Sequence, residues 1–339
     1  MAAEGMPFPW RWKGGKISTY LDIIWEMSVK DLGTRMKKTL LRMTLFVVAC
    51  LSYQVHATDT GNTKKAASPM ISITWLGGPT MLINFNDFQV LTDPMFGNGE
   101  EAFLMGDPNE MFDLAKGPNI KHYQRLSHFS GVALEEIDLV VLSHAHEDHF
   151  DQAAEQQLNK TIPMLIPTAN LQQLKQKGFN TLTDLKWGES VTYNAGEGEV
   201  IFTAVNAHHS ADPEIDTILG TGNGYWIEFK QGDWRRTVYW TGDTLPTDDV
   251  IKQIKKLGRP DILIPHMGRV GTTGPLGKIS MGADDVLKMS DELFPKKLLP
   301  IHHSTYSLYL EPISHLVVKS QGKSYDLDLI SEGSTVVYE

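Results

Sequence analysis

The chain has 339 residues, enough for one large domain or two small ones, and its apolar and charged fractions are ordinary for a globular protein. Its net charge of −10 argues against a nucleic-acid surface, because phosphate backbones require clustered lysine and arginine. The single cysteine, Cys50, excludes an intramolecular disulfide framework and a thiolate metal site in the body of the protein.

Residues 36–57 have the features of a bacterial secretory signal: a basic start, a short apolar stretch and a small-x-small ending. The apolar stretch is too short to span a bilayer comfortably. Translation from Met36 would leave residues 1–35 as an N-terminal extension without an assigned role. The sequence therefore predicts an exported, periplasmic protein. Because the residues before Cys50 resemble a lipobox, a lipidated outer-membrane protein is the alternative, and only that form would contact a membrane. An ordinary amphipathic helix is the third interpretation.

We expect mass spectrometry of the protein from its native host to find a chain that begins at Thr58. Cleavage after Ala57 removes eight basic and four acidic side chains, so 23 basic and 37 acidic side chains remain and the net charge becomes −14. Such a surface is unsuited to polyanions, and a small molecule is the expected partner. A mature chain that begins at Met1 and stays in the cytosol would contradict both forms of export.

Residues 58–70 have the composition of a linker, and a dense pattern of predicted elements occupies residues 71–339. Its first part predicts three short strands joined by Gly-Gly-Pro and Asn-Asp turns, at residues 71–77, 80–85 and 88–94. The Gly-, Pro- and Asp-rich residues 95–133 predict a long loop, with a helical turn near residues 110–114. A loop of that length in a compact domain is usually functional.

An apolar run at residues 138–142 predicts a buried strand, and it ends in the sequence SHAHEDHFD. Alternate residues of an extended chain share a face, so His144 and His146 point the same way. His149 breaks this alternation and requires a turn, before a predicted helical stretch that reaches Lys160. The strand end can thus direct His144, His146, Asp148 and His149 into one small space, as one or two metal ions require.

The rest of the chain predicts strands first and strand–helix units later. The predicted order is a strand–helix pair at 164–178, strands at 190–193, 198–207, 224–230 and 236–243, a helix at 247–258, a strand at 261–266, a helix at 282–294, a strand at 296–303 and two terminal strands. This order suits two sheets with helices on the outside. Trp226, Tyr239 and Trp240 alternate within strands and are expected in the core.

Eight of the twelve histidines follow predicted strands, at positions 144, 146, 149, 208, 209, 266, 302 and 303. Asp243 also follows a strand directly. Strand-end loops at one edge of a sandwich converge, so separated residues can complete the site that the first motif begins. His122, His128 and His315 are instead expected to be surface or packing residues.

Together, the H-x-H-x-D-H motif, a later histidine, Gly-Asp after a strand and a last histidine after a strand resemble the metallo-β-lactamase superfamily, over about residues 71–339. Within it, the chain is most similar to the group that contains L-ascorbate-6-phosphate lactonase and N-acylphosphatidylethanolamine phospholipase D. The motifs that carry this similarity are WLGGPTMLI, LTDPMF, DLVVLSHAHEDHFD, DILIPHMG, SMGADDVL and LLPIHHSTY. The resemblance implies an α/β fold, a four-layer αββα sandwich.

The resemblance also implies two divalent metal ions, with zinc expected and manganese or iron as alternatives. The implied ligands are His144, His146 and His209 for the first metal, Asp148, His149 and His302 for the second, and Asp243 between them. Asp93 would support the ligand loop from behind, and His208, His266 and His303 would lie behind the ligands or toward substrate. Neighbours on an extended chain face opposite ways, so one histidine of each pair faces the site; the family's A-x-H-S and P-x-H-x-x-T patterns select His209 and His302. Glu147 departs from the group, in which an aromatic residue is common.

The implied activity is hydrolysis of a lactone, ester or phosphodiester by a metal-bound hydroxide, without a protein base. Asp243 would fix the separation of the metals, and Asp148 would orient the hydroxide and later protonate the leaving group. The alternatives are a β-lactamase-like hydrolase and a non-catalytic metal-binding periplasmic protein on the same fold. His266 is predicted either to contact substrate or to make a structural hydrogen bond.

Overall fold

The structure is a computed structural model that describes residues 68–339. The predicted signal peptide and Cys50 lie outside these residues, as does most of the predicted linker. Among the described residues, the structure contains no helix with the length and apolar character needed to cross a membrane.

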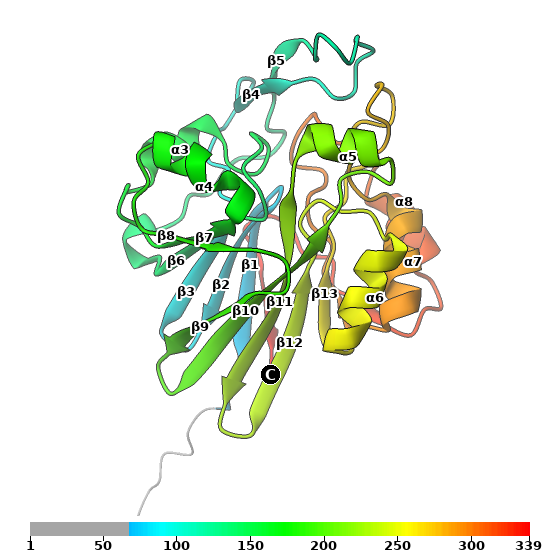
Figure 1. The fold of residues 1–339 in the computed structure, drawn as a ribbon. Helices are drawn as coiled ribbons and strands as arrows, with labels where there is room; N and C mark the ends of the chain where they lie inside the picture. The colour runs from blue at the N-terminus through cyan, green and yellow to red at the C-terminus, as the bar shows by residue number, and fades with distance from the viewer. Residues whose placement is uncertain (1–67) are drawn as a thin grey trace, which may run out of the picture. The chain divides into compact units, whose positions relative to one another are not determined.

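Two seven-stranded sheets form the centre of the described domain (Figure 1). The first sheet has the order β16-β1-β2-β3-β6-β7-β8, and the second has the order β15-β14-β13-β12-β11-β10-β9. The strands of the first sheet are β1 (Ile71–Gly77), β2 (Thr80–Phe85), β3 (Phe88–Thr92), β6 (Leu139–Val141), β7 (Met164–Pro167), β8 (Leu182–Leu185) and β16 (Thr335–Tyr338). Those of the second are β9 (Ser190–Ala195), β10 (Gly198–Ala207), β11 (Gly222–Gln231), β12 (Trp234–Trp240), β13 (Ile262–Ile264), β14 (Lys297–Leu298) and β15 (Asp326–Leu327).

Each sheet combines an antiparallel part with a parallel part. Strands β1 to β3 pair antiparallel, whereas β3, β6, β7 and β8 pair parallel. In the second sheet, β9 to β12 form antiparallel hairpins and β12 to β15 pair parallel. Strands β6, β7 and β13 of the parallel parts are buried along their whole length, which explains their uninterrupted apolar runs. The histidine motifs and Asp243 follow the carboxyl ends of β6, β10, β12, β13 and β14, which meet at one edge of the sandwich.

The side chains of the central strands alternate between the interior of the sandwich and the helical layers. In β11, Tyr225 and Ile227 lie between the sheets, whereas Trp226 lies on the helical side. In β12, Trp240 lies between the sheets and Tyr239 on the helical side. Trp226, Tyr239 and Trp240 are almost fully buried, which confirms the prediction that they belong to the core.

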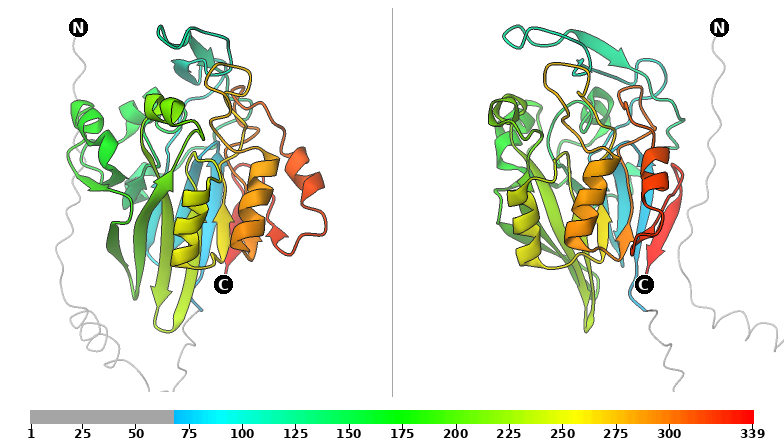
Figure 2. Two further views of the ribbon diagram at one scale, coloured as in Figure 1. Left: turned by 45° about the vertical axis from the view of Figure 1, so that its right-hand side comes forward. Right: turned by 90° about the vertical axis from the view of Figure 1, so that its right-hand side faces the viewer.

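Helices cover the outer face of each sheet (Figure 2). Ala154 of α3 (Gln152–Gln157) and Leu174 of α4 (Leu171–Gln176) pack on the first sheet. Helices α6 (Asp248–Leu257), α7 (Ala283–Leu293) and α8 (Ser314–Lys319) pack on the second. The described domain therefore has four layers in the order αββα, and the predicted fold is confirmed.

The main departure from the predicted elements lies in residues 95–133. Instead of a plain loop, this segment contains a separate hairpin of β4 (Phe103–Gly106) and β5 (Ile120–Tyr123). The predicted helical turn at 110–114 is wrong. The chain turns instead at residues 114–116, where the backbone N–H groups of Lys116 and Gly117 donate to the Asp113 carbonyl. Five further elements were not predicted from the sequence: β8, α5 (Pro213–Leu219), α8 and the 3₁₀ turns η1 (Leu134–Glu136) and η2 (Thr168–Asn170).

Candidate metal centre

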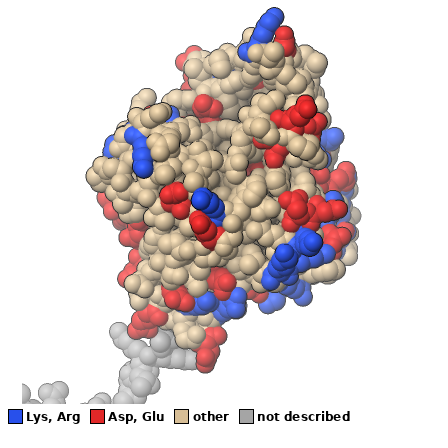
Figure 3. Space-filling view, viewed as in Figure 1, with Lys and Arg blue, Asp and Glu red and all other residues tan. Residues whose placement is uncertain are grey.

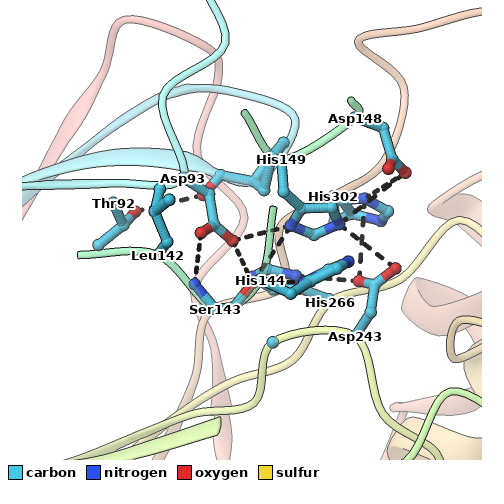
Figure 4. A network of polar contacts seen from close by, with 12 residues as sticks. Thr92, Asp93, Leu142, Ser143, His144, Asp148, His149, Asp243, His266 and His302 are labelled. Carbon is cyan, nitrogen blue, oxygen red and sulfur yellow. Dashed lines mark hydrogen bonds and ion pairs between the residues drawn. The ribbon is translucent and has the colours of Figure 1, made fainter. Parts of the chain in front are cut away.

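The predicted ligands converge at the carboxyl edge of the two sheets. Figure 4 shows His144, Asp148, His149, Asp243 and His302 there. The loop after β6 supplies His144, His146, Asp148 and His149, and the loops after β10, β12 and β14 supply the others. Three groups have ligand atoms that all lie within 4.8 Å of one another. They are His144, His146 and His209; His149, Asp243, His266 and His302; and His144, Asp148 and His149.

Asp93, directly after β3, holds the loop after β6 from behind. One carboxylate oxygen accepts from the Ser143 backbone N–H at 2.7 Å. The other accepts from the Ser143 hydroxyl at 2.6 Å and from His149 Nδ1 at 2.8 Å. Burial outweighs the hydrogen bonds from His149 and Ser143 and raises the pKa of Asp93 above its ordinary value. The Ser143 N–H and hydroxyl both donate to this carboxylate, and with Asp93 ionised the third partner, His149 Nδ1, donates as well.

These contacts fix which nitrogen of each imidazole carries the proton. The ring proton of His149 lies on Nδ1, because that nitrogen donates to Asp93. The other nitrogen, Nε2, is then unprotonated and faces the site. The Ser143 hydroxyl donates to Asp93, so it accepts from His144 Nδ1 at 3.0 Å, which leaves His144 Nε2 for the site. Both rings therefore present an Nε2 lone pair.

Two further rings donate to backbone carbonyls, which can only accept. His302 Nδ1 donates to the Met267 carbonyl at 2.8 Å, so its Nε2 lone pair faces inward. His146 Nε2 donates to the Leu219 carbonyl at 2.9 Å, so its Nδ1 is the available ligand atom. Such an outer hydrogen bond is what a metal-binding histidine normally has, because it fixes the ring orientation.

The inner atoms lack protein partners, as expected for a site that takes a cation. His149 Nε2 and His302 Nε2 are buried without a hydrogen bond. His209 Nε2 lies 3.2 Å from His144 Nε2, so two ring nitrogens face one point. Since buried polar atoms are nearly always paired, these unpaired nitrogens fit a divalent ion.

Two buried carboxylates complete the donor set. Asp243 Oδ2 lies 3.3 Å from His149 Nε2, and Asp148 Oδ2 lies 3.7 Å from His302 Nε2. Burial lowers the pKa of His149, but the charges of Asp243 and Asp148 outweigh burial and raise it well above the ordinary value. The two negative carboxylates beside His149 therefore favour a positive charge at this point, which a bound divalent ion would supply.

The members of the two histidine pairs point in different directions. His208 donates toward Asp216 of α5 at 2.7 Å and Asp249 of α6 at 2.9 Å, away from the cluster that contains His209. His303 packs its ring on Trp75, with ring centroids 4.7 Å apart, while His302 faces the carboxylates. His302 has a φ of +60°, a left-handed conformation that ordinary side chains adopt mainly at constrained sites. The ligand assignment itself stays a prediction.

His266 lies in the same cluster, but its hydrogen bonds argue against a ligand role. The indole N–H of Trp240 donates to His266 Nε2 at 2.6 Å, so Nε2 is an acceptor. Burial lowers the pKa of His266 to about 3, so the ring is neutral and its single proton lies on Nδ1. That N–H donates to Asp243 Oδ1 at 3.1 Å. Of the two predicted roles, the geometry therefore supports the structural hydrogen bond.

Replacing His266 with phenylalanine should lower the affinity of the protein for metal about 10–100-fold, because Asp243 loses the donor that orients it. The matched Trp240→Phe variant keeps His266 but removes the donor that sets its tautomer, so we expect a smaller effect in the same direction. Competition with a chelator measures both. A loss of kcat/KM with unchanged metal affinity would instead show that His266 contacts substrate.

The loop that carries His302 is also tied to the C-terminal segment. The His302 backbone N–H donates to the Gly78 carbonyl at 2.8 Å, and the Gly78 N–H donates to the Thr305 hydroxyl at 2.7 Å. Thr305 Oγ1 donates to Glu332 at 2.8 Å, and Arg125 donates to Glu332 at 2.9 Å. This chain of contacts connects the segment 95–133 to a predicted ligand.

A mostly apolar pocket of about 220 Å³ opens directly over the centre. Asp148, Asp243, His146 and His209 form part of its wall. The remaining wall consists of residues from the β4–β5 hairpin, from α5 and from residues 270–279. The metal centre is thus reached through a pocket, as expected for an enzyme that acts on small molecules.

Comparison with known proteins places the chain in a family. Residues 89–303 match the family described as the beta-lactamase superfamily domain. The chain is 26% identical over 253 residues to the N-acyl-phosphatidylethanolamine-hydrolyzing phospholipase D 1 of Caenorhabditis elegans, covering 70% of this chain and 67% of that protein. It is 26% identical over 276 residues to the UPF0173 metal-dependent hydrolase of Archaeoglobus fulgidus, covering 78% of this chain and 98% of that protein.

The fold is also similar to solved structures. The crystal structure of isothiocyanate hydrolase from Delia radicum gut bacteria has a TM-score of 0.63 and 22% identity, covering 78% of this chain and 98% of that one. Fold, His/Asp clusters and relatives together define a metal-dependent hydrolase. The chain belongs to the metallo-β-lactamase superfamily.

Several contributors to the site were missed by sequence reasoning. Ser143 precedes the first ligand and orients two histidines, but a serine beside a histidine motif gives no separate signal. Helix α5 supplies the carbonyl that fixes His146, and its start was readable, because Asp212 caps it and Pro213 follows at the first helical position. His122, His128 and His315 are exposed and lie outside the clusters.

Proposed function

We propose that this hydrolase binds two divalent ions and cleaves an ester, lactone or phosphodiester bond in a small molecule. The observation that carries the proposal is that two clusters of side chains able to bind metal lie next to each other. One cluster is His144, His146 and His209, the other is His149, Asp243, His266 and His302, and a third group of His144, Asp148 and His149 joins them. When bound, such ions lower the pKa of a shared water and polarise the bond under attack.

The chain's own residues would divide the remaining tasks. Asp243, oriented by His266, would hold the two ions at a fixed separation. Asp148 lines the pocket and is near the second cluster, so it can orient the attacking water and return a proton to the leaving group. The imidazoles of His302 and His149 outweigh the effect of burial and hold the pKa of Asp243 well below its ordinary value, so Asp243 stays a carboxylate.

Metal analysis and a substrate panel test this proposal. Elemental analysis of the purified protein should find two divalent ions per chain. Turnover should appear with carboxylic esters, lactones or phosphodiesters, and a phosphodiester substrate has support from the name of the Caenorhabditis elegans relative. One ion per chain would overturn the dinuclear mechanism. Cleavage of β-lactams alone would favour a β-lactamase-like hydrolase, and bound metal without any turnover would favour a non-catalytic protein.

A further inference from the structure

We propose that the substrate carries an apolar, uncharged arm, which the pocket over the metal centre holds beside the bond that is cut. The inference rests on the proposed function and names the substrate class for that site. It derives from the composition of the pocket wall, from the charges around it and from the contacts that keep its roof in place.

The wall facing away from the ligands is almost entirely apolar. The β4–β5 hairpin contributes Met105, Phe112 and Leu114, helix α5 contributes Ile218 and Leu219, and the segment 270–279 contributes Val270, Leu276 and Ile279. Leu114 and Ile218 line the pocket and yet are 44% and 59% exposed, so apolar surface continues to the mouth. Exposed apolar residues that are continuous with a pocket indicate an apolar ligand.

Apart from the predicted metal site, the described lining of the pocket has no cation that could bind a negative charge on the substrate's arm. Among its described lining residues there is no lysine or arginine, whereas Glu147 is an additional acidic residue there. The cations that adjoin lining residues along the chain are paired: Lys116 with Asp113 at 3.8 Å, Arg269 with Glu311 at 3.7 Å, and Lys278 with Asp285 at 2.6 Å. Lysines and arginines gather over α6 at the lower right of Figure 3, and few lie on the upper part of that face. An anionic arm would therefore lose its hydration without gaining a partner.

The β4–β5 hairpin and the segment 270–279 form the roof of the pocket, and hydrogen bonds hold this roof in place. The side chain of Asn109 donates to the Leu308 carbonyl at 2.9 Å and accepts from the Gly271 N–H at 2.7 Å. The Thr273 hydroxyl donates to the Asn109 carbonyl at 2.6 Å. Below this contact, the buried carboxylate of Asp107 accepts from the Tyr123 hydroxyl at 2.7 Å and pairs with Lys121. Since the hairpin is fixed to the segment 270–279, the apolar wall exists before a ligand arrives.

Binding of a neutral apolar dye without a hydrolysable bond, N-phenyl-1-naphthylamine, to the full chain with its metal in place tests the pocket independently of catalysis. We expect saturable binding to one site, weakened about tenfold by Phe112→Gln and by Leu276→Gln, because each removes an apolar contact. Phe112 is half-buried in a loop, so Phe112→Gln should fold even if Leu276→Gln does not. Met111→Gln is the matched control, because Met111 is the neighbouring residue, is 77% exposed and lies outside the wall.

Catalysis by the metal-loaded protein gives the second readout. Among p-nitrophenyl esters, kcat/KM should rise at least about tenfold from acetate to octanoate, and it should fall again for the suberate half-ester, whose arm has a similar length but ends in a carboxylate. Phe112→Gln should reduce the preference for octanoate. Equal dye binding by wild type and both variants, or equal cleavage of octanoate and suberate esters, would overturn the proposal. Site-dependent dye binding without cleavage of any bond class would support the pocket and overturn the proposed function.

Discussion

Replacement of Asp243 by asparagine should lower kcat at least about a hundredfold while the protein stays folded. The exchange is nearly isosteric, but it removes a negative charge from a buried point 3.3 Å from His149 Nε2. The amide oxygen can still accept from His266, but the NH2 group then replaces the carboxylate oxygen that faces His149 Nε2 and offers donor hydrogens there. We expect a similar loss for Asp148→Asn, because a neutral amide can neither orient an attacking water as a carboxylate does nor carry its proton.

The measurement is turnover of the substrate found in the panel, combined with elemental analysis and circular dichroism. Asp233→Asn is the matched control, because it makes the same chemical change at an exposed position in the turn between β11 and β12. Reduced metal content in Asp243→Asn would show that the residue holds metal. Unchanged turnover in Asp148→Asn would mean that the mechanism is wrong.

Truncation of Arg125 to alanine should destabilise the described domain by about 3–5 kcal/mol, the usual cost of removing one partner from a buried ion pair. The Arg125 side chain is fully buried. It donates to Glu332 at 2.9 Å, to the Leu76 carbonyl at 2.6 Å and to the Tyr306 hydroxyl at 3.0 Å. The substitution removes the positive charge that pairs with Glu332 and one donor from each of the other two groups, so thermal unfolding should shift down by roughly 5–15 °C.

Arg235→Ala is the control for this prediction, since it removes the same charge from a half-exposed pair with Glu228 at 2.7 Å. Exposed pairs contribute about 0–1 kcal/mol, so its unfolding temperature should change little. Equal shifts in the two variants would show that the buried network around Arg125 adds no stability. Because Glu332 also accepts from Thr305 in the loop of His302, Arg125→Ala should weaken metal binding as well.

Most of the sandwich could be predicted from sequence, because its central strands are short, continuous runs of apolar residues. The runs at 139–142 and 262–264 are apolar throughout, as parallel strands buried on both faces must be. The motif of His144, His146 and His149 follows one of these strands, so its convergence with other strand-end residues followed from the layer architecture. The positions of β1 to β3 were likewise set by short turns at Gly-Gly-Pro and Asn-Asp.

The parts that could not be predicted depend on distant contacts. Strands β4 and β5 have mixed apolar and polar sequences, and their hairpin is held in place by Asn109, whose side chain bonds to Leu308 and Gly271, both far away in the sequence. Helix α5 is only seven residues long, too short for a clear period, although its capping residues were visible. The role of His266 depends on Trp240 Nε1, a partner that no local pattern reveals.

The predicted ligands come from both halves of the sandwich. His144, His146, Asp148 and His149 follow a strand of the first sheet, whereas His209, Asp243 and His302 follow strands of the second. A bound ion would therefore cross-link the two sheets at one rim, while the opposite rim, with the β11–β12 turn, is joined by side-chain packing and by the hydrogen bonds of the Asn86 side chain to the Ala195 carbonyl and to Gln231. Chelation should accordingly speed amide hydrogen exchange at the strand ends near the ligands and leave the far hairpins unchanged, which gives the molecule one end whose rigidity depends on its metal supply.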